Sequence, residues 1–222
     1  MHFSSIISGL SLASLALAGG YSGAGKCGAI KPAYAAKVVS QFTTDGIIPD
    51  LIEAPTLGTP KVKVNAAYGT KKVNLGTYFK TLETVNAPSI EFTGEAKYDP
   101  KTTKYIIFLV DPDVPFNGAP GIQMNFNHLT IADAQPFCVT DTRKTLVIYE
   151  PLTPASNTQH RYTFLVYRQP ADFDSGDLVQ KALLQVRTPF DLNDFAQDNK
   201  LKLVGGNFLK EAATNGLQSP PL

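Results

Sequence analysis

The stretch Phe108-Leu-Val-Asp-Pro-Asp-Val-Pro115 opens the most informative part of this 222-residue chain. It continues an apolar run that begins at Tyr105, and an unbroken run of this kind predicts a buried β-strand. The run gives way to two aspartates and two prolines, so carboxylates stand where the strand ends. Farther along the chain, His128 and His160 each lie at the edge of another apolar, strand-like run.

These polar residues are candidates for a binding site. The chain has three histidines, and the third, His2, lies in the apolar N-terminal segment. Two imidazoles, two carboxylates and nearby aromatic rings suit a small pocket for an anionic or zwitterionic headgroup. Two other interpretations stay open. His128, His160 and Asp111 could form a two-histidine, one-carboxylate metal site, or the histidines could be hydrogen-bonded core residues.

Three blocks of the sequence resemble the phosphatidylethanolamine-binding protein family. The first is Phe108–Pro115 with His128 after it, and the second is Tyr149-Glu-Pro-Leu-Thr-Pro154 with His160-Arg-Tyr-Thr-Phe-Leu-Val-Tyr-Arg-Gln-Pro170. The third is Arg187-Thr-Pro-Phe-Asp-Leu-Asn-Asp-Phe-Ala196, which leads into Val204-Gly-Gly-Asn-Phe208. A weaker match covers Phe42–Asp50, so the resemblance extends from about residue 37 to residue 210.

The resemblance implies a fold and a site. The fold is mainly β, with a large antiparallel sheet packed against a smaller sheet and short helices near both termini. The family's pocket takes phosphate-like or acetate-like groups beside the head of a phospholipid, and needs no metal, cofactor or catalytic nucleophile. The central residues of that pocket match Asp111, His128 and His160. The residues that line it match Pro115, Pro154 and Tyr162.

Several positions near this pocket depart from the family pattern. Leu152-Thr-Pro154 replaces a Gly-Pro-Pro or Ser-Pro-Pro segment, and Leu203-Val-Gly-Gly206 replaces Pro-Val-Ala-Gly. Leu209 stands where some animal members have a pocket tyrosine, and Leu129 where an aromatic residue often follows the first histidine. The preference for a particular headgroup is therefore not carried over. Asp113 is expected to hydrogen-bond its own turn, and Arg161 to form a structural ion pair.

Composition limits the class of protein. With 43% hydrophobic residues, a chain of this length can bury one sizeable core, so we expect one domain. Twenty basic and nineteen acidic residues give a formal net charge of +1, and no run of like charge exceeds Lys71-Lys72. Because a duplex-binding protein normally carries a basic stripe, nucleic acid is not an expected partner.

The N-terminus predicts a secreted protein. Residues 3–18 are apolar and end in Ala16-Leu-Ala18, which is typical of a signal peptide cleaved before Gly19. We therefore expect a signal peptide over 1–18, an N-terminal arm over 19–31, a domain over 32–214 and a tail over 215–222. Delivery to the vacuole is the alternative destination. No other apolar run is long enough to span a bilayer.

Cys27 and Cys138 are the only cysteines. An even number in a chain that passes through an oxidising compartment predicts a Cys27–Cys138 disulfide, whereas two buried free thiols are the alternative.

The residue pattern predicts a helix from Ala33 to Phe42, begun by Pro32 and stopped by Asp45-Gly46. A short helix over Asp191–Gln197 has Asp191 as its N-cap, and a further helix is expected over Asn207–Ala213. Between the terminal helices the pattern is strand-like. The expected strands are 61–65, 89–93, 105–110, 129–131, 145–149 and 162–167.

Three functions follow from these observations. The first is a secreted, non-enzymatic protein that binds a headgroup or small anion between Asp111, His128 and His160. The second, from the inhibitor branch of the same family, is inhibition of a serine carboxypeptidase, to which a flexible N-terminal arm contributes. Cys27 would restrain that arm and so weakens this alternative. The third is a hydrolase, which only the aspartate and histidine set supports.

Overall fold

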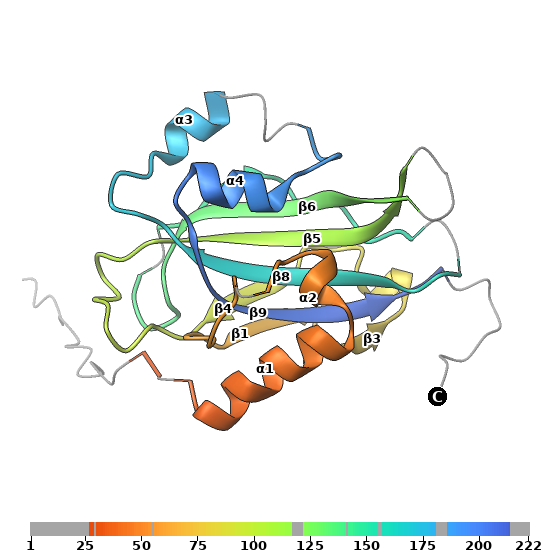
Figure 1. Cartoon of the computed structure of the whole chain (residues 1–222), viewed down its shortest axis with the longest axis horizontal. Coiled ribbons are helices and arrows are strands. Elements are labelled where there is room, and N and C mark those ends of the chain that lie inside the picture. The colour runs from red at the N-terminus through yellow and green to blue at the C-terminus, as the bar shows by residue number, and fades with distance from the viewer. Residues whose placement is uncertain are drawn as a thin grey trace, which may run out of the picture.

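The computed structural model describes residues 27–28, 30–54, 56–116, 122–140, 142–154, 157–180 and 186–213. Two β-sheets pack face to face, and the helices lie at the periphery (Figure 1). The expected mainly-β architecture, a large sheet on a smaller one, is confirmed. The expected signal peptide, most of the N-terminal arm and the C-terminal tail lie outside the described residues.

The large sheet has six strands in the order β3-β9-β8-β5-β6-β7. In that order they are Thr77–Phe79, Lys202–Glu211, His160–Arg168, Tyr105–Pro115, Gln123–Ala134 and Lys144–Val147. All neighbours are antiparallel except β3 and β9, which run parallel. The small sheet has the order β2-β1-β4, formed by Lys71–Val73, Val64–Tyr68 and Ser89–Phe92.

The helices are short and lie mostly on one face of the large sheet (Figure 1). They are α1 (Pro32–Thr44), α2 (Ile47–Asp50), α3 (Ser175–Gln180), α4 (Leu192–Asp198) and the 3-10 helix η1 (Thr81–Glu83). The predicted N-cap is confirmed, since the Asp191 side chain accepts a hydrogen bond from the Asp194 amide at 2.9 Å. Among the described helices none is long and apolar enough to cross a membrane.

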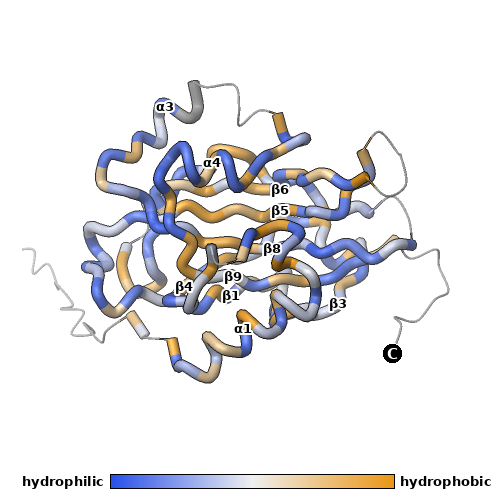
Figure 2. Tube along the Cα trace, viewed as in Figure 1, coloured by the Kyte–Doolittle hydropathy of each residue, from blue (hydrophilic) through white to orange (hydrophobic). Residues whose placement is uncertain are grey.

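The central strands of the large sheet have a core on each face. On one face Phe108 of β5 packs against Phe195 of α4, within a cluster that also holds Val38 of α1. On the other face Leu109 belongs to the core between the two sheets, with Phe164 of β8. A strand covered on both sides is apolar at every position, which explains the continuous run in β5 (Figure 2).

The prediction of a helix over Asn207–Ala213 is wrong, because β9 continues through Glu211 between β8 and β3. Two residues of β9 favour this strand. A Cβ atom at Gly206 would lie 2.7 Å from the Phe42 ring, so only glycine permits the close approach. The buried Asn207 amide donates to the carbonyls of Val64 and Val73, and so joins β9 to the small sheet.

Other boundaries also differ from expectation. The first strand of the small sheet occupies 64–68 rather than 61–65, and β5 and β6 are longer than their apolar runs. Strands β2 and β3 and helix α3 were not predicted. The predicted disulfide is confirmed, with the Cα atoms of Cys27 and Cys138 5.3 Å apart.

Candidate functional site

Three neighbouring strands bring the predicted polar residues together. Asp111 lies near the end of β5, His160 begins β8, and His128 lies on β6; both of these strands pair with β5. The Nδ1 atom of His160 is 2.7 Å from Oδ2 of Asp111. All three side chains are buried, with exposed fractions between 2% and 6%. The residues are therefore shielded from most of the surrounding water.

Asp111 fixes the orientation and charge of His160. One carboxylate oxygen accepts from the Asp113 amide at 2.8 Å, and the other contacts the imidazole. Burial lowers the pKa of His160, but the hydrogen bond and negative charge of Asp111 outweigh burial and raise it above its ordinary value. His160 thus favours the imidazolium form, in which its second nitrogen is also a donor.

His128 differs from His160 in its environment. Its Nδ1 atom is 2.9 Å from the carbonyl oxygen of Glu150, which can only accept, so Nδ1 carries the hydrogen. Burial lowers the pKa of His128, and the hydrogen bond to Glu150 and the negative charge of Asp111 do not reverse the effect. The site therefore combines one imidazole whose pKa is lowered with another whose pKa is raised.

Aromatic rings enclose both imidazoles. The Tyr162 ring centroid is 5.3 Å from that of His128, edge to face, and 6.1 Å from that of His160, stacked. The Phe126 ring centroid lies 4.6 Å from that of His128. Tyr162 is 1% exposed and contacts both imidazoles, which is consistent with its predicted role as a lining residue.

The two predicted prolines are less closely connected to the site. Pro115 is exposed at the last position of β5, four residues beyond Asp111. Pro154 is buried in the segment between β7 and β8. The contacts that join Asp111, His128, His160 and Tyr162 include neither proline, so their role as lining residues stays a prediction.

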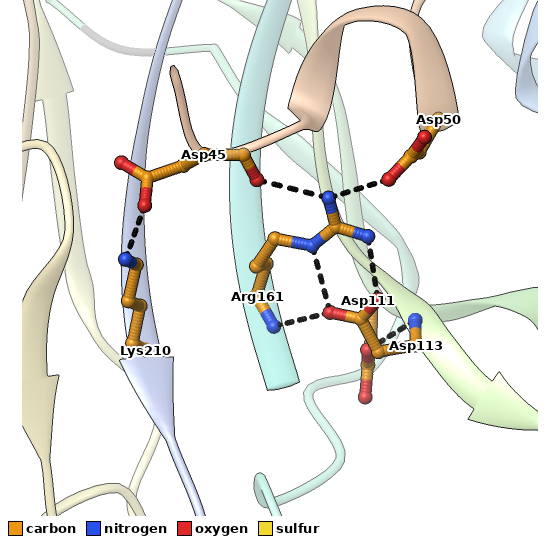
Figure 3. Close-up of polar contacts among 6 residues, drawn as sticks. All are labelled: Asp45, Asp50, Asp111, Asp113, Arg161 and Lys210. Atoms are coloured by element: carbon orange, nitrogen blue, oxygen red, sulfur yellow. Dashed lines mark hydrogen bonds and ion pairs between the residues drawn. The ribbon is translucent and has the colours of Figure 1, made fainter. Parts of the chain in front are cut away.

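Arg161 forms the expected ion pair on the helix side of the sheet (Figure 3). Its Nε and backbone N donate to Oδ2 of Asp113 at 2.9 and 2.7 Å, and its terminal nitrogens reach Asp113 Oδ1 and Asp50. A further bond goes to the carbonyl of Asp45, whose side chain pairs with Lys210. This network connects the α1–α2 junction to the end of β5 that carries Asp111.

The sequence interpretation missed two functional candidates. Arg187 donates to the carbonyls of Asn127 and Ile148 at 3.0 and 2.8 Å and pairs with Glu150 at 3.0 Å. Arg187 therefore connects the part of β6 that carries His128 to Ile148 and Glu150, which follow β7. The only feature of the sequence that could have pointed to Arg187 is its place in the third block that resembles the family.

The second missed residue is Glu211, which is fully buried opposite His160 on β9. Strand alternation through Asn207, Leu209 and Glu211 would have placed it on the core face, but the helix prediction concealed that pattern. Within the described ranges, no group of three or more His, Cys, Asp or Glu side chains is arranged to hold a metal ion.

Known proteins share the sequence pattern and the fold. Residues 64–209 match the family model described as phosphatidylethanolamine-binding protein. The chain is 32% identical over 179 residues to a 26 kDa secreted antigen of Toxocara canis. That match covers 78% of this chain, which spans 63% of the length of the antigen.

Three solved structures share the fold. The carboxypeptidase Y inhibitor, solved in complex with its cognate proteinase, superimposes with a TM-score of 0.67 at 24% identity, covering 82% of this chain and 97% of the inhibitor. A phosphatidylethanolamine-binding protein from Plasmodium falciparum gives 0.64 at 20% identity, covering 78% and 96%. One from Plasmodium vivax gives 0.62 at 20% identity, covering 80% and 98%.

Proposed function

Because this chain belongs to the phosphatidylethanolamine-binding protein family, we propose that it is a secreted, non-enzymatic binding protein. Its ligand is a phospholipid headgroup, or a small phosphate or carboxylate anion, held between Asp111, His128 and His160. The observation that carries the proposal is the 2.7 Å contact between Asp111 and His160, beside a second, neutral imidazole.

The two imidazoles have complementary tasks in this proposal. His160 offers an N–H donor and a positive charge that Asp111 keeps in place. His128 uses Nδ1 to contact Glu150, which leaves Nε2 to face the ligand. An arriving anion favours protonation of this second ring, because an opposite charge stabilises the imidazolium. Binding is therefore expected to be accompanied by proton uptake.

The surroundings of the site favour a lipid headgroup over a free anion. Among the described residues, the exposed large hydrophobic side chains include Ile148 and Val186, which lie on neighbouring segments because Arg187 donates to the Ile148 carbonyl. Ile148 precedes the segment that anchors His128, and Val186 precedes Arg187. Exposed apolar side chains that gather in one region mark contact with a protein or a membrane. Acyl chains beside a bound headgroup would cover them.

Secretion is supported by two observations. The Toxocara canis relative is named as a secreted antigen. The disulfide between Cys27 and Cys138 is a bond that persists in oxidising compartments. Both agree with the signal peptide expected over 1–18.

The first experiment tests binding of the soluble headgroup and of a free anion, without a lipid. Calorimetric titration of the mature protein with phosphorylethanolamine and inorganic phosphate is compared with the same titrations of His128→Ala and His160→Ala. We expect each change to weaken binding by about 1–3 kcal/mol, since a donor in a partly desolvated site is lost. Unchanged affinity in both variants would contradict the pocket.

Vesicle sedimentation then tests the lipid. Phosphatidylethanolamine-containing vesicles should retain wild type, and retention should fall in Ile148→Ser. Phe137→Ser is the matched control, because Phe137 is also exposed, at 55%, but lies away from the site on the segment after β6. Equal loss of retention in both variants would show that the site does not direct contact with lipid.

Inhibition of a serine carboxypeptidase is the second candidate function. The observation that favours it is the structural likeness to an inhibitor solved with its proteinase, which at 24% identity shows the shared fold. If the arm over 19–31 acts in inhibition, deletion of residues 19–25 should abolish inhibition and leave anion binding intact. Absence of inhibition by the intact mature protein at micromolar concentration would exclude this function.

A further inference from the structure

A carboxyl group lies directly across the strand pair from His160. Glu211 is the register partner of His160 in the β8–β9 ladder, so both side chains point to the same face of the sheet. Directly opposed residues of an antiparallel pair have Cβ atoms about 4.5–5.5 Å apart. Glu211 is 0% exposed and His160 is 4% exposed. The acid and the imidazole therefore share one environment of low polarity.

The hydrogen bonding of Glu211 is incomplete. Its Oε2 atom accepts from the Thr84 hydroxyl at 2.8 Å, and the nearby Thr81 side chain also favours the ionised form, whereas Oε1 is buried with no described donor at hydrogen-bond distance. An ionised carboxylate with an unpaired oxygen in such a place carries an uncompensated desolvation cost. The neutral acid avoids most of this cost, and burial accordingly raises the pKa of Glu211 to about 7.

Among the described residues, the charged group that lowers the pKa of Glu211 is His160. Tyr68 of β1, Tyr149 after β7, and Tyr162 of β8 interact with it electrostatically, and each is an acid that is neutral at neutral pH. Glu83 of η1 adds a negative charge that also opposes ionisation of Glu211. The neighbouring Lys210 side chain pairs with Asp45 (Figure 3). The imidazolium of His160, which favours ionisation of Glu211, is therefore already shared with Asp111.

We propose that Glu211 is a proton-controlled switch of the anion site, permitting ligand binding at His160 when protonated and opposing it when ionised. The inference rests on the proposed anion-binding function. With Glu211 neutral, the charges of His160 and Asp111 balance, and an anion meets no net repulsion. Ionisation of Glu211 places a second negative charge beside His160, so the affinity for anions falls as pH rises through neutrality.

The first test measures the electrostatic interaction between Glu211 and His160 in the absence of ligand. The imidazole signals of His160 are followed by NMR as a function of pH in wild type, in Glu211→Gln and in Glu91→Gln. Glu91 is exposed on β4 and supplies the same change of charge away from the site. Because ionised Glu211 stabilises the imidazolium, the pKa of His160 should be lower in Glu211→Gln than in wild type and unchanged in Glu91→Gln. An identical titration in all three proteins would overturn the proposal.

The second test measures binding of acetate, which keeps one negative charge between about pH 5.5 and about pH 8.5. Wild-type affinity should fall more than that of Glu211→Gln over this range, by about tenfold, the effect of one charge acting at several ångströms in a partly polar medium. Parallel pH profiles for the two proteins would contradict the switch. If wild type binds no acetate at any pH, the anion pocket itself is refuted, and the switch with it.

A second variant covers the case in which Glu211→Gln does not fold. Thr84→Val keeps the size of the side chain but removes the donor to Oε2. Loss of that donor disfavours the ionised carboxylate, so the fall in acetate affinity should move to higher pH. A shift to lower pH, or none, would overturn the assignment to Glu211.

Discussion

The two histidines of the site have opposite pKa shifts although Tyr162 contacts both rings. His160 is held beside a carboxylate, and His128 beside a neutral carbonyl. Burial lowers the pKa of both rings, and at His160 the hydrogen bond and charge of Asp111 outweigh it. At the scale of single residues, the direction of each shift therefore depends on the balance between burial and the partner of Nδ1.

Ligand binding should be linked to protonation of His128. Burial lowers its pKa, so the ring is neutral at pH 7 in the free protein. Phosphorylethanolamine supplies the negative charge that favours its imidazolium form. Calorimetry in two buffers of different ionisation enthalpy should show proton uptake by wild type and a smaller uptake by His128→Ala. Equal uptake by both proteins would assign the proton to another group.

Glu211 should make stability fall as pH rises. Its pKa is raised from 4.5 to about 7 in the folded protein, so the native state binds the extra proton between these values. Stability linked to this group is fully present below about pH 4.5 and is lost through pH 7, by about 2–3 kcal/mol. Thermal melts at pH 5 and pH 8 should show this loss in wild type and in Glu91→Gln, but much less of it in Glu211→Gln. The same loss in Glu211→Gln would exclude Glu211 as its origin.

At the scale of elements, Arg161 connects β8 to the helices. Its side chain points to the face opposite His160 because side chains alternate along a strand. There it meets Asp113 of β5, Asp50 of α2 and the carbonyl that ends α1. One strand thus carries a residue of the candidate site on one face and, on the other, the arginine that binds the residues around α1 and α2.

The two acidic partners of Arg161 should differ in importance. Asp113 is 6% exposed and makes a bidentate contact, so Asp113→Asn leaves a buried guanidinium poorly paired and should cost about 3–5 kcal/mol. Asp50 has a side chain that is 50% exposed, so Asp50→Asn should cost less than about 1 kcal/mol. Urea denaturation of the two variants measures both values. Equal costs would show that burial does not govern this network.

At the scale of the whole molecule, a disulfide links the segment before α1 to the segment after β6. Cys27 and Cys138 are 111 residues apart in sequence. A cross-link over a loop of this length restricts the unfolded chain and contributes about 4–5 kcal/mol in the chain-entropy model. Beside the bridge, the Cys27 carbonyl accepts from the Gly94 amide at 2.8 Å, which also holds Cys27 next to the segment after β4.

Non-reducing peptide mapping of the purified native protein should find the Cys27 and Cys138 peptides linked. Replacement of both cysteines by serine should lower the free energy of unfolding by up to about 4–5 kcal/mol in urea titrations. Two thiols that are freely alkylated in the native protein would contradict the bridge.

The sequence by itself determined most of the site and much of the fold. Asp111 follows its own apolar strand, and His128 and His160 each border another, so local pattern and family resemblance located all three. The helices at 32–44 and 192–198 were found because proline and aspartate act on their nearest neighbours in sequence.

Tertiary structure alone decided the conformation of residues 207–211. Residues 207–211 have no local signal that excludes a helix, and they form a strand because β8 and β3 supply hydrogen-bond partners on both sides. That pairing places Glu211 opposite His160, although 51 positions separate them. The acid that adjoins the pocket became visible only through this register, since sheet contacts depend on residues distant in sequence.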